Sequence, residues 1–230
     1  MDIKLLLRRA HRRYREKGLL TLLSDTVSFV LSGFSLRVYQ SSEKDLDQRW
    51  SMIGPYIAET DNTALDIGCA EGGITNRLAE HGCFSIGIDT DGDRLDMAID
   101  RYGLNERVGF MRHVVTPDNI EKLPEFDVTI LLTVYHHWGN EFGWRTARRM
   151  LQTLGEKSDK LVIELPGSES STPEDFTADA ESLEEYYLAF LNEAFEEQPV
   201  KHIGTSTLKR DDGREDPLYY VETDSFTVAE

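Results

Sequence analysis

An apolar run enters a glycine-rich corner in the stretch Leu65-Asp66-Ile67-Gly68-Cys69-Ala70-Glu71-Gly72-Gly73-Ile74-Thr75. Apolar residues precede the glycines and a helix-forming run follows them, so the pattern predicts a strand, a tight turn and a helix. Glycine lets the backbone approach a ligand closely because it carries no side chain. The stretch therefore predicts a turn that cradles a nucleotide.

A second apolar run, Cys83 to Ile88, ends at Asp89. An acid at the tip of the neighbouring strand can accept hydrogen bonds from both hydroxyls of a ribose. Two strand tips are thus predicted to share one ligand.

Two cofactors fit a glycine-rich corner with a ribose-binding acid. The spacing Gly68-x-Ala70-x-x-Gly73 also satisfies the dinucleotide fingerprint. A dinucleotide, however, places its pyrophosphate at the helix N-terminus, where Glu71 and the nearby Asp66 would repel it. S-adenosylmethionine (SAM) has no phosphate and carries an ammonium and a sulfonium, which carboxylates attract. The charges favour SAM.

The motif resembles the first motif of the class I SAM-dependent methyltransferases, acid-x-Gly-x-Gly-x-Gly, with alanine in place of the middle glycine. The resemblance runs from about Asn62 to Val221. It implies a Rossmann-like, doubly wound α/β fold, whose seven-stranded, mostly parallel sheet ends in an antiparallel hairpin. The SAM contacts that it implies come from Asp66, Gly68, Ala70, Glu71, Gly72 and Asp89.

A third predicted strand, Val108 to Val115, leads into a short polar segment. In the family an acid here hydrogen-bonds the adenine amino group and the next apolar residue packs on the ring. The resemblance implies Asp118 or Asn119 as the hydrogen-bonding residue, and Ile120 against the ring.

The fourth predicted strand, Phe126 to Val134, is almost continuously apolar, as expected for a strand buried on both faces. It ends in Tyr135-His136-His137-Trp138, near the predicted position of the sulfonium. Imidazole titrates near neutral pH, so His136 and His137 are candidate general bases for a hydroxyl acceptor, with His136 preferred. The alternative is that one histidine packs against cofactor or core and the other caps the strand end.

A metal site formed by the two histidines and Glu164 is disfavoured, because adjacent histidines on a strand point in opposite directions. We therefore predict no metal. The aromatic residues Tyr135, Trp138 and Trp144 could form a platform for a sugar ring or a base, or could pack in the core.

The remaining elements follow in the family's order. The pattern predicts helices over Asp91 to Tyr102, Arg145 to Leu154 and about Pro173 to Glu197, and a strand over Lys160 to Leu165. Two last strands, Val200 to Lys209 and Pro217 to Glu222, flank a hairpin turn at Asp211-Asp212-Gly213.

The charge is strongly acidic: 42 Asp and Glu residues stand against 25 Lys and Arg, for a net charge of −17. Such a surface argues against nucleic-acid binding. An acid-rich chain with 17 Arg but only 8 Lys predicts a protein from an extreme halophile, because concentrated salt screens charge. An ordinary acidic protein is the alternative.

Residues 1–40 are predicted to form a basic, amphipathic helical arm, with residues 41–230 as the methyltransferase domain. Within Met1 to Lys17, seven basic residues stand against two acidic ones, while apolar residues recur at helical spacing. The arm either contacts an anionic membrane surface or packs on the domain. Cys69 and Cys83 lack metal-ligand spacing and indicate a reducing, cytoplasmic compartment.

The sequence leaves several alternatives for the molecule that accepts the methyl group. The arginine-rich start resembles those of proteins for surface-glycan assembly in halophilic archaea, which implies methylation of a lipid-linked sugar at the inner membrane face, on a hexuronate carboxylate or a hydroxyl. Leu132 to Gly139 resembles RNA-capping relatives, which implies RNA terminal or 2′-hydroxyl methylation as the alternative. A non-catalytic SAM-binding module is the second alternative.

Overall fold

The protein is described by a computed structural model, which covers residues 46–167, 182–196, 198–207 and 215–223. The predicted arm over residues 1–40, its boundary with the domain, the turn at Asp211 and the predicted helix start at Pro173 lie outside the described residues. None of the helices within those ranges is long and apolar enough to cross a membrane.

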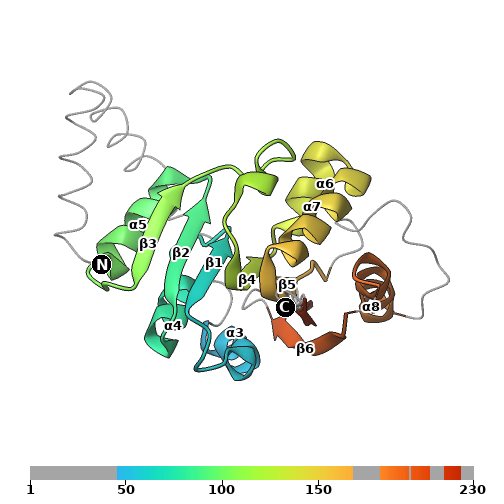
Figure 1. The fold of residues 1–230 in the computed structure, drawn as a ribbon, viewed down its shortest axis with the longest axis horizontal. Coiled ribbons are helices and arrows are strands. Elements are labelled where there is room, and N and C mark those ends of the chain that lie inside the picture. Colours follow the sequence, from blue (N-terminus) through green and yellow to red (C-terminus); the bar gives the residue numbers. More distant parts are fainter. Residues whose placement is uncertain (1–45, 168–181, 197, 208–214, 224–230) are drawn as a thin grey trace, which may run out of the picture. The chain divides into compact units, whose positions relative to one another are not determined.

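A seven-stranded sheet with the order β3-β2-β1-β4-β5-β7-β6 forms the centre of the domain (Figure 1). Five strands are parallel, and β7 pairs antiparallel with both β5 and β6. This confirms the predicted α/β class and the terminal antiparallel hairpin. The strands are β1 (Thr63–Ile67), β2 (Phe84–Asp89), β3 (Val108–Arg112), β4 (Phe126–Leu132), β5 (Ser158–Glu164), β6 (Val200–Thr207) and β7 (Glu215–Glu222).

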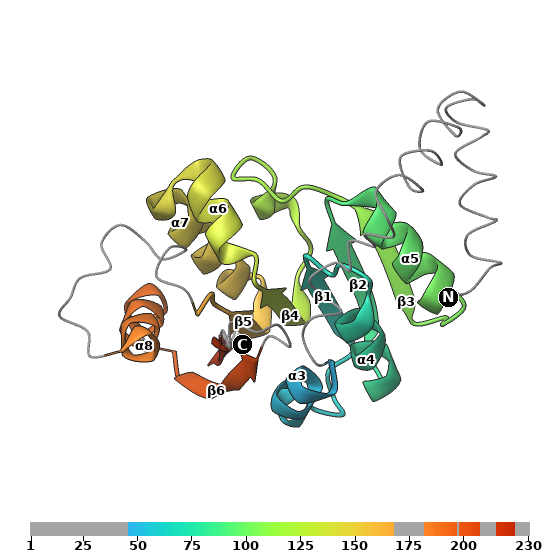
Figure 2. The ribbon, with the colours of Figure 1, turned by 180° about the vertical axis from the view of Figure 1, so that it is seen from behind.

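The described residues also form six α-helices and two short 3-10 helices, of which α3 and η2 precede β1 (Figure 2). The α-helices are α3 (Leu46–Ile53), α4 (Gly73–His81), α5 (Gly92–Tyr102), α6 (Tyr135–Phe142), α7 (Trp144–Glu156) and α8 (Leu183–Ala194). The 3-10 helices are η2 (Gly54–Tyr56) and η3 (Ile120–Lys122). Side chains cap the N-termini of two helices. Asp91 accepts hydrogen bonds from the backbone N–H groups of Asp93 and Arg94 at α5, and Ser182 accepts one at α8.

The direction of each crossover decides which face of the sheet a helix covers. Parallel crossovers are right-handed, so α4 and α5, which step from β1 towards β3, belong on one face and α7, which steps from β4 to β5, on the other. The two hydrophobic cores agree: α3 and α4 contribute Ile53 and Leu78 to one, and α7 and α8 contribute Leu151 and Leu191 to the other. The strand order reverses between β1 and β4, which is where an open α/β sheet binds its ligand.

The structure corrects the predicted ends of two strands. β4 stops at Leu132, and the Tyr135-His136-His137-Trp138 cluster begins helix α6 instead of ending the strand. The chain turns at Thr133, whose φ of 56° no strand can accommodate. β3 likewise stops at Arg112, three residues before the predicted end.

Candidate cofactor and active site

The turn between β1 and α4 needs its glycines. Gly68 and Gly72 both have a φ of 75°, and a Cβ atom at Gly68 would lie 2.4 Å from the Val134 side chain. A Cβ at Gly72 would lie 2.6 Å from the ring of Phe110. Ala70 has a φ of 50°, in the left-handed region where the family motif has glycine. The substituted motif therefore keeps the backbone shape of the turn.

Asp89 is oriented by this turn. One carboxylate oxygen accepts a 2.8 Å hydrogen bond from the backbone N–H of Ala70, and the other accepts one of 2.8 Å from the N–H of Asp91. The side chain is buried but lines a pocket. Each oxygen keeps capacity for a further donor. The carboxylate is thus held in position to accept from two ligand hydroxyls.

Asp66 lies on β1, just before the turn, and outside the pocket lining. Its carboxylate is 2% exposed and accepts a 2.6 Å hydrogen bond from the hydroxyl of Thr75. Burial raises the pKa of Asp66 to about 6, although the hydrogen bond from Thr75 acts in the opposite direction. Asp66 therefore makes no direct contact with the pocket, and any attraction of its carboxylate for a bound cation would act through the turn.

The other cofactor candidates also lie outside the pocket lining. Glu71 forms an ion pair with Arg101 of α5 at 3.2 Å. Asn119 uses its amide in a local turn, where it accepts from the N–H of Thr116 and donates to the carbonyl of Val114, both at 2.8 Å. Asp118 is exposed.

Ile120, the residue expected against the adenine ring, is buried in the core next to α7. Where we expected Asp118, Asn119 and Ile120, the pocket is lined instead by His113, Val114 and Val115.

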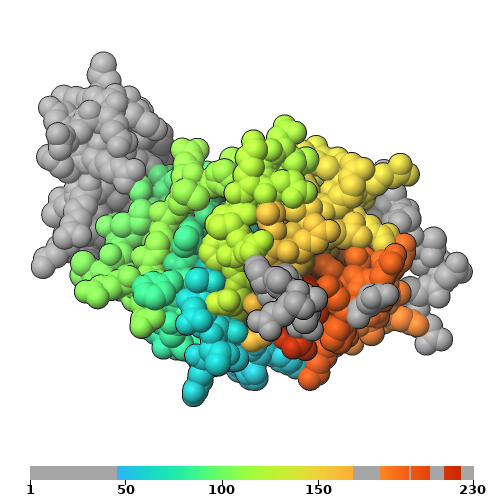
Figure 3. All heavy atoms as spheres, viewed as in Figure 1, coloured from blue at the N-terminus to red at the C-terminus, as the bar shows by residue number. Residues whose placement is uncertain are grey.

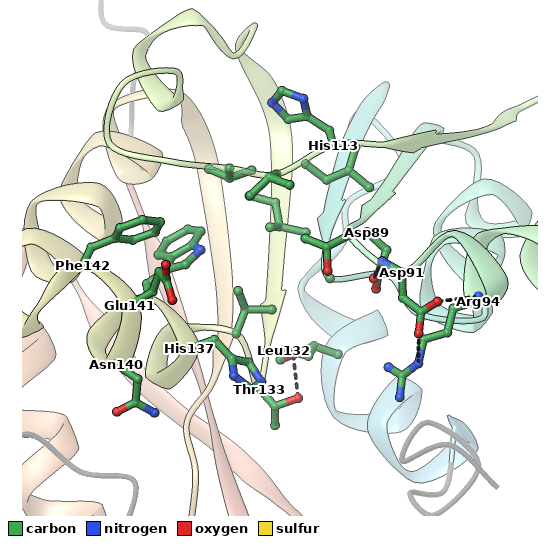
Figure 4. Close-up of a pocket in the computed structure, with 18 residues that line it drawn as sticks. Asp89, Asp91, Arg94, His113, Leu132, Thr133, His137, Asn140, Glu141 and Phe142 are labelled. Atoms are coloured by element: carbon green, nitrogen blue, oxygen red, sulfur yellow. Dashed lines mark hydrogen bonds and ion pairs between the residues drawn. The ribbon is translucent and has the colours of Figure 1, made fainter. Parts of the chain in front are cut away.

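The pocket has a volume of about 560 Å³ and opens at the carboxyl ends of the parallel strands (Figure 4). Gly68 and Asp89 form one side, together with Asp91 and Arg94 at the start of α5. Thr133, which follows β4, lies between the two sides in Figure 4. Side chains of α6 form the other side: His137, Trp138, Asn140, Glu141 and Phe142.

The two histidines lie on α6, with ring centroids 4.0 Å apart. His137 lines the pocket and His136 does not, which reverses our preference for His136 as a base. Burial lowers the pKa of His137, so its imidazole is neutral at pH 7 and can accept a proton. We predicted both histidines at the end of a strand. They lie on helix α6 instead, where successive side chains point in other directions than on a strand.

Glu164 is unavailable to the histidines. It is fully buried at the end of β5, where Arg49 of α3 forms an ion pair with its carboxylate and Ser206 donates a hydrogen bond to it. Within the described ranges, no group of three or more His, Cys, Asp or Glu side chains is placed to hold a metal ion.

Sequence reasoning missed several residues of the pocket wall. Thr133, Asn140, Glu141 and Phe142 have no motif of their own, and their place depends on α6 starting where it does. His113 was missed because the predicted third strand ran to Val115, whereas β3 ends at Arg112 and places His113 at the edge where the carboxyl ends of the parallel strands meet.

Comparison with known proteins assigns the domain. Residues 65–156 match the family model described as a methyltransferase domain. This match covers the glycine-rich turn, Asp89 and α6, which are the parts that build the pocket. Residues 65–156 therefore form a methyltransferase domain of the SAM-dependent type.

One curated relative is the O-antigen chain terminator bifunctional methyltransferase/kinase WbdD of Escherichia coli, 29% identical over 107 residues. These residues are 44% of this chain and 15% of the relative, so the chain spans only a small part of that protein. A WbdD crystal structure matches with a TM-score of 0.63 and 23% identity, covering 78% of this chain and 40% of that one.

A second structure, of magnesium protoporphyrin IX methyltransferase from Synechocystis PCC 6803 with bound SAM, matches over almost the whole length of both chains. Its TM-score is 0.54 at 16% identity, with 96% of this chain and 98% of the other covered. SAM is the cofactor of this domain. The pocket fits it, since the carboxylate of Asp89 is already oriented and the volume suits a small molecule.

Proposed function

We propose that this chain transfers the methyl group of SAM to an oxygen of a sugar in a lipid-linked glycan, and that a hexuronate carboxylate is the acceptor. The observation that carries this proposal is the similarity to the O-antigen chain terminator WbdD, which is 29% identical to this chain over 107 residues. The basic, amphipathic arm predicted at the start of the sequence supports an acceptor at a membrane surface.

The transfer is an in-line displacement in which an acceptor oxygen forms a bond to the methyl carbon as the carbon–sulfur bond breaks. The protein contributes by aligning the two reactants and excluding water. The α6 side of the pocket, with His137 and Trp138, supplies the wall beside which the acceptor enters. SAM supplies the methyl group, and S-adenosylhomocysteine leaves.

The proton balance separates the two acceptor chemistries. A hexuronate carboxylate is ionised at pH 7 and releases no proton on methylation, so no base is needed. A hydroxyl must lose its proton to a base as the bond forms. Within the part of the chain that the structure describes, no Asp or Glu side chain hydrogen-bonds to His137 to orient its ring. This supports the carboxylate as acceptor.

The proposal is tested by incubating the protein and methyl-labelled SAM with lipid-linked glycans from a strain that lacks the protein. We expect label in the glycan fraction, released by mild alkali because an ester is hydrolysed and an ether is not. Label that resists alkali would favour the hydroxyl. Absence of transfer to every lipid-linked glycan would reject the sugar acceptor.

A further inference from the structure

A second hollow, of about 420 Å³, lies between α7 and α8 and has no part in the cofactor pocket. Figure 3 shows α6 and α7 in yellow next to α8 in orange. We call this hollow the α7–α8 groove. The residues that matter here are Tyr135, Trp144, Arg145, Arg148, Tyr186 and Phe190.

Aromatic rings form much of its wall. The ring of Tyr135 packs 5.7 Å from that of Trp144 and 5.5 Å from that of Phe190, measured between centroids. Tyr135 is buried, whereas Trp144, Tyr186 and Phe190 are half-buried, so part of each of these three rings is open to the groove. Aromatic faces offer a large apolar surface with little conformational freedom to lose.

Two arginines stand beside these rings. Arg145 is exposed and, within the described part of the chain, forms no ion pair. Arg148 pairs at 2.9 Å with Glu193, whose side chain is 71% exposed, and its guanidinium lies 5.8 Å from the centre of the Phe190 ring. An exposed pair of this kind contributes little stability, so a ligand can replace it.

The combination selects a ligand that is both ring-shaped and anionic. A guanidinium binds a carboxylate through two parallel hydrogen bonds. The chain has 42 acidic residues, but the groove is lined by two arginines and one glutamate. Its local charge is therefore positive, which attracts an anion.

We propose that the α7–α8 groove binds an acidic oligosaccharide, whose sugar rings stack on the aromatic side chains and whose uronate carboxylates pair with Arg145 and Arg148. This inference rests on the proposed glycan acceptor and names its class more closely. The groove holds sugars adjoining the one that is methylated.

Helix α6 explains why the ligand must be an oligomer. Tyr135, its first residue, faces the groove, while His137 and Trp138 face the cofactor pocket. A helix with its side chains is about 10–12 Å across, so one sugar ring cannot occupy both sites. A chain of several sugars can pass over the start of α6.

The test is a binding titration without SAM, at fixed KCl concentration, with a short oligogalacturonate as the probe. The fully methyl-esterified oligomer of the same length is the uncharged control. We expect the wild-type protein to bind the acid form and to bind the ester form at least about tenfold more weakly, the factor that corresponds to about 1.4 kcal/mol.

Three variants sharpen the test. Arg145→Gln and Arg148→Gln should each weaken binding of the oligogalacturonate about tenfold. Arg149→Gln is the matched control, because Arg149 lies on the same helix, is exposed and stays outside the groove lining, where it donates a 3.5 Å hydrogen bond to Thr146. It should bind as the wild type does. Unchanged SAM affinity in all three verifies that they fold.

Equal affinity for the acid and ester forms, no binding of either, or equal losses in the Arg145 and Arg149 variants would overturn the groove as a site. The two proposals fail separately. If the acid oligomer binds but no glycan is methylated, the groove stands and the proposed function falls. If a glycan is methylated with an unchanged KM in Arg145→Gln and Arg148→Gln, the groove falls and the function stands.

Discussion

A buried carboxyl group at position 66 makes folding sensitive to pH. The folded pKa of Asp66 is raised from 3.8 to about 6 by burial, so the folded state holds a proton that the unfolded chain has already lost. The stability that this proton provides is complete below about pH 4 and is lost as pH rises through 6. Above pH 6, the domain contains a buried negative charge.

Asp66→Asn should remove that cost, because the amide oxygen still accepts the hydrogen bond from Thr75 and carries no charge. We expect the variant to exceed the wild type in free energy of unfolding by up to about 3 kcal/mol at pH 7, with the difference disappearing towards pH 4. Denaturant unfolding at fixed KCl from pH 4 to 7 measures this. Parallel profiles for the two proteins would contradict it.

The histidines report which oxygen accepts the methyl group. With a hexuronate acceptor, His137→Asn should leave kcat at saturating SAM within about tenfold, because no proton is transferred. A hydroxyl acceptor would instead cost about 10² to 10⁴ in kcat and remove the lower limb of the pH profile. His136→Asn is the matched control, since His136 touches the ring of His137 but does not line the pocket.

At the scale of elements, α3 is fastened to the sheet through one buried ion pair. Arg49 of α3 reaches Glu164 of β5, and Ser206 of β6 donates to the same carboxylate. Arg49 is 12% exposed and Glu164 is fully buried. Removing one member of such a pair costs more than removing both, because the remaining charge stays desolvated.

We therefore expect Arg49→Leu to lower the free energy of unfolding by about 3 to 5 kcal/mol. The double variant Arg49→Leu, Glu164→Gln should recover part of that loss. Thermal and denaturant unfolding of Arg49→Leu, Glu164→Gln and the double variant gives the free energies of unfolding for a double-mutant cycle. Additive losses would show that the pair does not hold α3 in place.

The elements also show what sequence could predict. The turn at Gly68 was predictable because its glycine-rich sequence marks a backbone conformation that other residues rarely adopt. The structure gives the reasons: a φ of 75° and a position where a Cβ atom would clash with Val134. The start of α6 was not, because it depends on Thr133 at positive φ, a conformation that β-branched residues rarely adopt. The contacts of Asn119 were hidden for a similar reason: its amide stabilises the local turn, which the sequence pattern does not distinguish from ligand binding.

At the scale of the whole molecule, charge is the dominant feature. A net charge of −17 repels itself in the folded state, and molar salt screens that repulsion. If the acidity is an adaptation to high salt, the thermal midpoint should rise steadily from low to molar KCl. A flat or falling midpoint would leave the composition without this explanation.

Calorimetric titration with SAM and with NAD measures whether the pocket at the carboxyl ends of β1, β2 and β4 binds SAM through Asp89. The wild type should bind SAM and not NAD. Asp89→Ala should weaken SAM binding by about 1 to 3 kcal/mol, because two charge-assisted hydrogen bonds are lost. Asp100→Ala, which removes an exposed acid of α5 away from the pocket lining, should bind SAM as the wild type does. Binding of NAD without binding of SAM would show that the pocket is a dinucleotide site and not a SAM site.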